Sequence, residues 1–473
     1  MKYICAISVH NKPMSRPSTV PTNALTLQMQ SRGMSSAQQL AEALGVNRST
    51  VSRGLSGLGN AVLRAGAARS ACYALRRSVR SLGQRWPLHR IEGSGRAQHL
   101  GEIHAVHGGF FWETPEVPPA WLRHGYTNGF FPGLPFFLSD LRPQGFLGRA
   151  LAREWGPLNG CPADLQQWGD DDALTVLLRA GDDLPGDLVL GDSALTAARQ
   201  TARNRSEQAI PEAECSRRYA VLADLAMQGG TAGSSAGGEQ PKFTAIVRGA
   251  GGELRAVLVK FSPPIDTPSG RRWADLLAAE WLALRLLAEH GHASAQVELV
   301  EGGGRRFLEV TRFDRSGATG RRGVLTLQAI EAGLIDEPAA DWPAVADAME
   351  RMGLMTEADA RALCRRWCFG QLIANTDMHL ANASVWLGDA EPLALAPAYD
   401  MLPMQFVPGS QGEIVPRNFS PVSPPPRLNA DWAAVTPWAL EFWHRLAADE
   451  RISPEFRAIG QRAGETVARL VAG

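Results

Sequence analysis

The sequence predicts an α+β fold in which a small β-rich lobe precedes a larger helical lobe, with a separate basic domain in front of both. A glycine-rich run leads into two strand-turn-strand patterns between residues 242 and 313, and after residue 316 the apolar residues recur at helical spacing. The chain carries 48 basic and 48 acidic side chains, yet residues 43–91 contain nine arginines and no acidic residue. At 473 residues the chain is too long for one ordinary core, so about three domains are expected.

The N-terminal part predicts a winged helix-turn-helix domain over residues 32–85, preceded by a disordered or misassigned tail at 1–31. Apolar spacing indicates two short helices separated by a glycine turn, and Asn47 is the expected cap of the second helix. The predicted elements are a helix at 36–44, a turn at 45–47, a helix at 48–58 and two wing strands at 62–66 and 71–75.

The second of these helices is the candidate DNA-contacting element. Its early positions are those from which a recognition helix reaches base edges and phosphates. A basic surface also attracts polyanions because phosphate neutralisation releases counterions. An alternative is a basic helical subdomain that packs on the rest of the chain and binds no duplex. The candidate contacts to double-stranded DNA are Arg48, Ser49, Thr50 and Arg53.

Residues 86–227 predict a further subdomain with a structural role. The stretch 130–141 is the most apolar and aromatic part of the chain and is expected in a core. Two acidic runs, 170–172 and 182–183, are interpreted as solvated loops and not as a metal site.

Residues 228–315 predict the small lobe. The run 229–238 is composed of small residues that let backbone N–H groups approach anionic oxygens, although a flexible linker has the same composition. Lys260 lies in an apolar strand, where a charge is costly unless it reaches the surface or meets a partner. Glu280, among the apolar positions of a predicted helix at 273–289, is the candidate partner.

Three oxygen-bearing side chains in the helical lobe, at 316–473, carry the chemistry. Asp377 and Asn382 are separated by four residues, and Asp400 follows a short apolar run. This spacing is typical of a phosphotransferase, in which an aspartate accepts the hydroxyl proton while an amide oxygen and a second carboxylate bind Mg²⁺. Taken by itself, the pattern is more often a capped loop between helix and strand, because Asp and Asn are common turn residues. The order of glycine run, hairpins, lysine and helical lobe favours the kinase interpretation.

These residues resemble the HipA-type serine/threonine kinases of bacterial toxin–antitoxin modules, and most closely the YjjJ-like branch with a fused N-terminal helix-turn-helix. The matching segments span about half of the chain. They are 234–242, Lys260, 312–315, 376–379 with Asn382, and 399–400. The chain departs from the common family pattern at Met378, where glycine is usual, and at Thr311, where glutamate is usual.

The resemblance implies a two-lobed, atypical protein-kinase-like fold in which 86–227 completes the smaller lobe. By this resemblance, Asp377 is the catalytic base, Asn382 and Asp400 are the Mg²⁺ ligands, and Lys260 contacts the ATP phosphates. The residues implied in nucleotide binding are Ala236, Gly237, Gly238, Glu239, Gln240, Lys242, Lys260, Thr311, Arg312, Phe313, His379, Asn382, Tyr399 and Asp400. Ser234 and Ser235 lie in the glycine run, and one of them is predicted to be phosphorylated by the enzyme itself; the added charge would then repel the ATP phosphates and eject the loop.

The implied activity is transfer of the γ-phosphoryl group of ATP to a protein hydroxyl, which would arrest growth. An aminoacyl-tRNA synthetase is the favoured substrate class, and an antitoxin protein is a further candidate partner. No apolar run approaches the roughly 20 residues that span a bilayer, so a cytoplasmic protein without a membrane partner is expected. The alternatives are a DNA-binding regulator whose kinase-like part is inactive or senses a nucleotide, and a DNA-acting toxin or nuclease.

Overall fold

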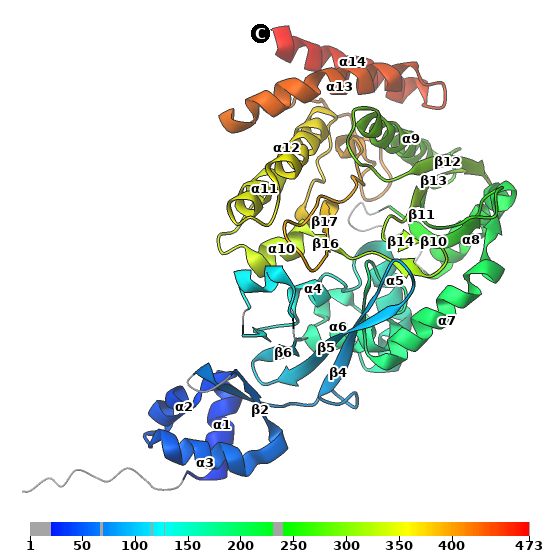
Figure 1. Ribbon diagram of the computed structural model, residues 1–473. Helices are drawn as coiled ribbons and strands as arrows, with labels where there is room; N and C mark the ends of the chain where they lie inside the picture. The colour runs from blue at the N-terminus through cyan, green and yellow to red at the C-terminus, as the bar shows by residue number, and fades with distance from the viewer. Residues whose placement is uncertain (1–19, 67–69, 115–116, 127, 230–239, 473) are drawn as a thin grey trace, which may run out of the picture. The chain divides into compact units, whose positions relative to one another are not determined.

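A computed structural model describes residues 20–66, 70–114, 117–126, 128–229 and 240–472 (Figure 1). The chain divides into two compact units. Within the described ranges, the first unit contains residues 20–85, 102–113 and 126–133, and the second contains the remainder. The segment 86–227, expected as one subdomain, is therefore divided between the two units.

The first unit contains three helices, α1 (Thr22–Arg32), α2 (Ala37–Leu44) and α3 (Arg48–Leu58). Ser36 begins α2 with a capping box, in which its hydroxyl accepts from the Gln39 backbone N–H and its own N–H donates to the Gln39 side chain. Gly45 ends α2 in the left-handed conformation, with φ of 64°. Both predicted helices are present. Asn47 does precede α3, but its side chain makes no capping hydrogen bond, so that part of the expectation is wrong.

Helix α1 corrects the expectation of a tail at 1–31. Leu25 and Met29 lie four residues apart on one face of α1, and both are buried in a core with Leu40, Val51 and Leu55. This burial makes residues 22–31 an integral part of the unit. Residues 1–19 lie outside the described part of the chain.

Two small sets of paired strands complete the first unit. A three-stranded sheet has the order β1-β3-β2, with β2 and β3 antiparallel as expected for the two predicted strands. In the second set, β6 pairs antiparallel with β5 and with β7. The bounds are β1 (Ser35–Ser36), β2 (Val62–Ala65), β3 (Cys72–Leu75), β5 (Ala97–Val106, of which 102–106 belong to this unit), β6 (Gly109–Glu113) and β7 (Phe130–Phe131).

The first part of the second unit contains four helices and a strand pair. As expected, the apolar stretch contributes buried side chains, among them Phe136 and Phe137. The run 170–172 is not a solvated loop: it forms the first turn of α6, where Asp172 accepts a hydrogen bond from the Gly169 N–H at 2.9 Å. The elements are β4 (Arg85–Ile91) paired with β8 (Leu188–Leu190), α4 (Phe136–Ser139), α5 (Gly145–Trp155), α6 (Asp170–Ala180) and α7 (Asp192–Gln208).

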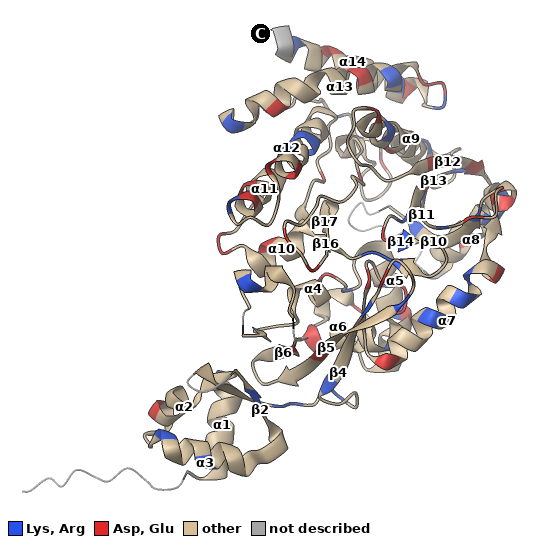
Figure 2. Cartoon of the chain, viewed as in Figure 1, with Lys and Arg blue, Asp and Glu red and all other residues tan. Residues whose placement is uncertain are grey.

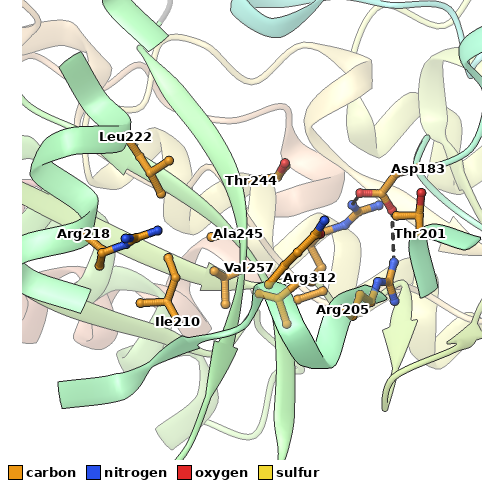
Figure 3. Close-up of a pocket in the computed structure, with 13 residues that line it drawn as sticks. Asp183, Thr201, Arg205, Ile210, Arg218, Leu222, Thr244, Ala245, Val257 and Arg312 are labelled. Carbon is orange, nitrogen blue, oxygen red and sulfur yellow. Dashed lines mark hydrogen bonds and ion pairs between the residues drawn. The ribbon is translucent and has the colours of Figure 1, made fainter. Parts of the chain in front are cut away.

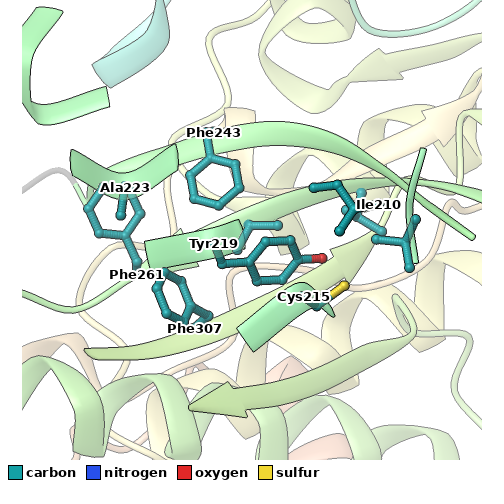
Figure 4. Packing of buried hydrophobic residues seen from close by; sticks show 10 residues of the cluster. Ile210, Cys215, Tyr219, Ala223, Phe243, Phe261 and Phe307 are labelled. Atoms are coloured by element: carbon teal, nitrogen blue, oxygen red, sulfur yellow. The ribbon is translucent and has the colours of Figure 1, made fainter. Parts of the chain in front are cut away.

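The small lobe is a five-stranded sheet of order β12-β13-β11-β10-β9, antiparallel except where β9 meets β10. Its strands are β9 (Ile210–Pro211), β10 (Lys242–Arg248), β11 (Leu254–Phe261), β12 (Val297–Gly302) and β13 (Arg305–Thr311), and its helices are α8 (Cys215–Gly229) and α9 (Pro268–Glu289). Val257, Val259 and Phe261 pack with Tyr219 of α8 in one aromatic core (Figure 4). Because strand side chains alternate between faces, Lys260 points to the opposite face of the sheet.

The rest of the second unit is mainly helical, as predicted. Helix α13 packs against both α12 and α14, and β16 pairs antiparallel with β17. The elements are β14 (Arg315–Ser316), β15 (Gly320–Arg321), β16 (Val324–Thr326), α10 (Leu327–Leu334), α11 (Trp342–Arg351), α12 (Glu357–Leu372), β17 (Ser384–Trp386), α13 (Asn429–Ala448) and α14 (Pro454–Ala472). Among the described helices, none is both long and apolar enough to cross a bilayer.

Candidate active site

A cavity of about 870 Å³ in the second unit gathers most of the candidate site residues. The small lobe contributes the start of β10 and Lys260 of β11, and the helical lobe contributes the loop after α12 and the segment around Asp400. The predicted residues that line this cavity are Gln240, Lys242, Lys260, Asp377, His379, Asn382, Tyr399 and Asp400.

Lys260 is the centre of a buried charge cluster. Its Nζ lies 2.6 Å from Oε1 and 2.9 Å from Oε2 of Glu280, and it also contacts Oδ1 of Asp400. Lys260 is 4% exposed and Glu280 1% exposed. The predicted pairing of Lys260 with Glu280 is therefore present, and the lysine bridges the helix of the small lobe to the helical lobe.

The surroundings keep Lys260 and Asp400 in their charged forms. Burial by itself lowers the pKa of Lys260, but the Asp400 and Glu280 carboxylates outweigh it and the net pKa is raised. Burial raises the pKa of Asp400, and the ammonium groups of Lys260 and Lys242 reverse this and bring the pKa to about 2. For Glu280 burial dominates, so its pKa is raised. Asp400 is thus an ionised carboxylate on the wall of the cavity.

A residue that sequence reasoning missed, Asn375, holds the loop after α12 to the Asp400 segment. Its Oδ1 accepts from the Asp377 backbone N–H at 3.1 Å, and its Nδ2 donates to the Asp400 carbonyl oxygen at 3.2 Å. Asp400 has a φ of 52°, a left-handed conformation that is unfavourable for a residue other than glycine. The hydrogen bond from buried Asn375 fixes the backbone at this strained position. The sequence signal that could have indicated Asn375 is its position two residues before Asp377.

Asn382 and Asp400 fit the requirements of a hard divalent cation. The Asn382 Nδ2 donates to the Asp377 carbonyl oxygen at 2.7 Å, which leaves the Asn382 Oδ1 as the side-chain atom available to a metal. An ionised carboxylate and an amide oxygen are the ligand types that Mg²⁺ takes, with waters and phosphate oxygens completing its shell. Residues 375–400 could therefore hold Mg²⁺ through these two oxygens.

The cavity also has donors suited to an anionic ligand. Gln240 is buried, and its Nε2 has no hydrogen-bond partner in the described part of the chain. An unsatisfied buried donor is costly, so a ligand oxygen at this place would offset the loss. Together with Lys242 and Lys260, Gln240 gives this side of the cavity the chemistry of a phosphate site.

Some predicted nucleotide contacts do not line this cavity. Arg312 extends toward Asp183 and Asp314, and its Nη1 lies 3.1 Å from Oδ2 of Asp183. The backbone N–H groups of Thr311 and Arg312 already donate to protein carbonyl oxygens, and Phe313 packs against the Tyr399 ring. The remaining candidates, Ser234, Ser235, Ala236, Gly237, Gly238 and Glu239, lie outside the described residues.

Asp183 also corrects the interpretation of 182–183 as a solvated loop. Its carboxylate accepts from Arg205 and Arg315 as well as Arg312, at 2.9 to 3.3 Å. Burial raises the pKa of Asp183, but these arginines outweigh burial and the net pKa is lowered.

One wall of the cavity comes from an unpredicted part of the chain. Residues 140–145, Leu147, Gly148 and Leu151, from α4 to α5, line it together with residues 183–185. Leu147 is 40% exposed, although its side chain is large and apolar. This wall is formed by contacts distant in sequence, which neither composition nor periodicity indicates.

Comparison with known proteins identifies the family. The family model for the middle domain of YjjJ-like toxins matches residues 82–199, and the HipA-like C-terminal domain model matches residues 234–467. Toxin YjjJ of Escherichia coli K12 is 35% identical over 440 residues, covering 93% of this chain and 96% of that protein. The chain belongs to the YjjJ-like, HipA-related toxin family. The cavity of this YjjJ-like chain is lined from both matched regions, since residues 140–151 lie in the first and Lys260 and Asp377 in the second.

Two solved structures are similar to parts of the YjjJ-like chain. HipA of Shewanella oneidensis MR-1, solved with HipB and operator DNA, is 14% identical with a TM-score of 0.49, covering 81% of this chain and 95% of that one. The Helicobacter pylori proinflammatory kinase CtkA is 10% identical with a TM-score of 0.36, covering 49% of this chain and 88% of that one.

Proposed function

We propose that the protein is a serine/threonine kinase that transfers the γ-phosphoryl group of Mg-ATP to a protein hydroxyl. This proposal rests mainly on one observation: Lys260, which is paired with buried Glu280 and with Asp400, lines the same cavity as Asp377, Asn382 and Asp400. Phosphoryl transfer requires mostly positioning and charge neutralisation, and these residues provide both.

Each residue has one role in this proposal. Asp377 is exposed at the cavity and accepts the proton of the attacking hydroxyl. Lys260, kept protonated, binds phosphate oxygens, and Asn382 and Asp400 hold Mg²⁺, which would neutralise charge on the phosphates. Gln240 and Lys242 bind further phosphate oxygens. We propose a protein substrate, with an aminoacyl-tRNA synthetase as the favoured class.

The test is phosphate transfer by the purified full chain. With ATP labelled at the γ-phosphate and Mg²⁺, we expect label on serine or threonine of the protein itself or of proteins in a bacterial lysate. Omission of Mg²⁺ should abolish the label. Absence of any labelled protein under all conditions would contradict the proposal.

Asn375 gives a prediction on positioning. Asn375→Ala should lower kcat roughly 10- to 100-fold, since the loop with Asp377 is no longer fixed to Asp400, while KM for ATP changes less. Stability should also fall by about 1–3 kcal/mol because buried polar groups lose partners. Asn375→Asp keeps the acceptor for the Asp377 N–H and should retain more activity. Unchanged kcat per folded molecule, measured with thermal unfolding alongside, would assign Asn375 a purely structural role.

We further propose that the first unit is a winged helix-turn-helix that binds double-stranded DNA. Arg48, Ser49 and Arg53 are exposed on α3, and α3 carries no acidic residue (Figure 2). Thr50, predicted with them, is 4% exposed and cannot reach a base. Its position on the inward face of α3, next to buried Val51, explains the error. The strand pair β2–β3 supplies the candidate wing.

The DNA proposal predicts a salt-dependent effect of two arginines. Arg48→Ala/Arg53→Ala in the full chain should weaken binding to duplex DNA and reduce the slope of log K against log salt by roughly one for each phosphate that is no longer neutralised. The charge-matched control is Arg351→Ala/Arg361→Ala, two exposed arginines of the second unit. Equal mobility shifts for both double variants across a salt series would rule out α3 as the DNA-binding element.

A further inference from the structure

A second cavity, of about 320 Å³, lies in the second unit beside the small-lobe sheet (Figure 3). Its walls come from α7, α8, β9, β10 and β11, with Arg312 and Asp183 at one end. In Figure 3, Arg218 and Leu222 lie on one side, and Arg205, Arg312 and Asp183 lie on the other. None of the residues assigned above to Mg²⁺ or to proton transfer lines it.

The charges that line this cavity are not balanced. Arg205, Arg218 and Arg312 face it, and Asp183 is the single carboxylate among the lining residues. That carboxylate is already shared, because it accepts from Arg205, Arg312 and also Arg315, and a second carboxylate, Asp314, pairs with Arg312 and Arg315, so Arg218 is the cation of the lining that these carboxylates do not pair. Arg205 is buried, so its charge is poorly solvated. A cavity lined in this way attracts an anion.

Arg218 is the donor most available to a ligand. It is exposed on α8, and it has no hydrogen bond or ion pair among the described residues. Its neighbour Arg217 instead pairs with Glu214 at 2.9 Å and does not line the cavity. The planar guanidinium donors of Arg218 suit phosphate oxygens geometrically, whereas those of Arg312 are already taken by Asp183 and Asp314.

The remaining walls are apolar. Ile210, Leu222, Ala245 and Val257 line the cavity next to the arginines. An inorganic anion would leave this surface in contact with water, whereas an organic group would cover it. The volume is near the lower limit for small-molecule pockets, which restricts the ligand to a small one.

We propose that this second cavity binds a small phosphomonoester, with the phosphate held by Arg218 and the organic part against Ile210, Leu222 and Val257. Asp183 lines the catalytic cavity as well, so the charge of a bound phosphate acts on a carboxylate shared by both cavities. A ligand in this cavity can therefore change the affinity of the catalytic cavity for its own ligand, and by thermodynamic linkage the catalytic ligand changes the affinity of this cavity by the same factor.

The test measures binding and does not depend on kinase activity. Phenyl phosphate, inorganic phosphate and phenol are titrated into the full chain by calorimetry at constant ionic strength. Phenyl phosphate should bind with one site and more tightly than either of the others. Arg218→Ala should weaken it about ten-fold, as for loss of a charge-assisted hydrogen bond, while Arg217→Ala should stay within about two-fold.

A second variant tests the place of binding by filling the cavity. Leu222→Trp puts a larger side chain on the partly buried wall and should remove phenyl phosphate binding without changing the thermal unfolding temperature by more than a few degrees. Absence of saturable binding to the wild type, equal effects of the two arginine variants, or full affinity in Leu222→Trp would each overturn the proposal. The last two results would place the phosphate in the catalytic cavity.

Discussion

Asp377→Asn is expected to reduce phosphate transfer roughly 10²- to 10⁴-fold, because the substitution removes the proton acceptor and keeps the size of the side chain. Asp377 is exposed, and Asn is close to Asp in size, so stability should change by no more than about 0.5 kcal/mol. Growth arrest on expression should be lost together with transfer. The measurements are label transfer, growth and thermal unfolding of the same variant.

Asp336→Asn is the matched control, since Asp336 is an exposed aspartate that does not line the cavity. It should behave as the wild type. Growth arrest that survives Asp377→Asn would favour a DNA-binding regulator, and DNA cleavage that survives it would favour a nuclease. Loss of all three activities with a large fall in unfolding temperature would show a folding defect instead.

Lys260→Met is expected to cost both activity and stability. The substitution leaves the Glu280 and Asp400 carboxylates close together without their shared ammonium group. Removal of one partner from a buried ion pair typically costs about 3–5 kcal/mol, so the unfolding transition of the second unit should move to a clearly lower temperature. Transfer should fall to background because phosphate oxygens lose their buried cation.

The double variant Lys260→Met/Glu280→Gln separates the loss of phosphate transfer from the loss of stability. Removing one of the two carboxylates should recover part of the stability, but transfer should stay at background. Stability that is not recovered, or transfer that returns, would contradict the assigned roles of the pair.

The same cluster predicts a dependence on pH. The pKa of Asp400 is lowered from 3.8 to about 2 in the folded chain, so its contribution to stability is present above pH 3.8 and is lost as the pH falls toward 2. Lys260→Met lacks the part of this contribution that Lys260 supplies, at all pH values. The stability difference between wild type and variant should therefore shrink below about pH 4, as measured by thermal unfolding at several pH values.

The small lobe could be predicted from the sequence because its signals are local. Alternating apolar residues in two hairpins predicted β10 with β11 and β12 with β13, and the strand charge of Lys260 required a partner, which Glu280 supplies. The site residues of the helical lobe were indicated by their spacing together with the glycine run, hairpins and lysine that precede them, and the structure brings them to one cavity.

The errors concern burial and distant contacts. Leu25 and Met29 form too weak an apolar pattern to predict α1, whose core partners come from α2 and α3. Thr50 was expected on the outward face of α3, although the helix turns it inward. The partners of Asp183, more than 20 residues away in sequence, could not be deduced from an acidic pair in isolation.

Residues 140–151, which form one wall of the catalytic cavity, lie outside the segment that contains the proposed catalytic residues. A fragment restricted to 234–467 would keep every acid, amide and lysine of the proposed reaction, but water would enter from the side where this wall now lies, and the higher local dielectric would weaken each charge interaction. Substitutions in α5 can therefore alter turnover or substrate preference while the sequence signature of the catalytic half stays intact, so surveys of related genes by signature alone would overlook such divergence.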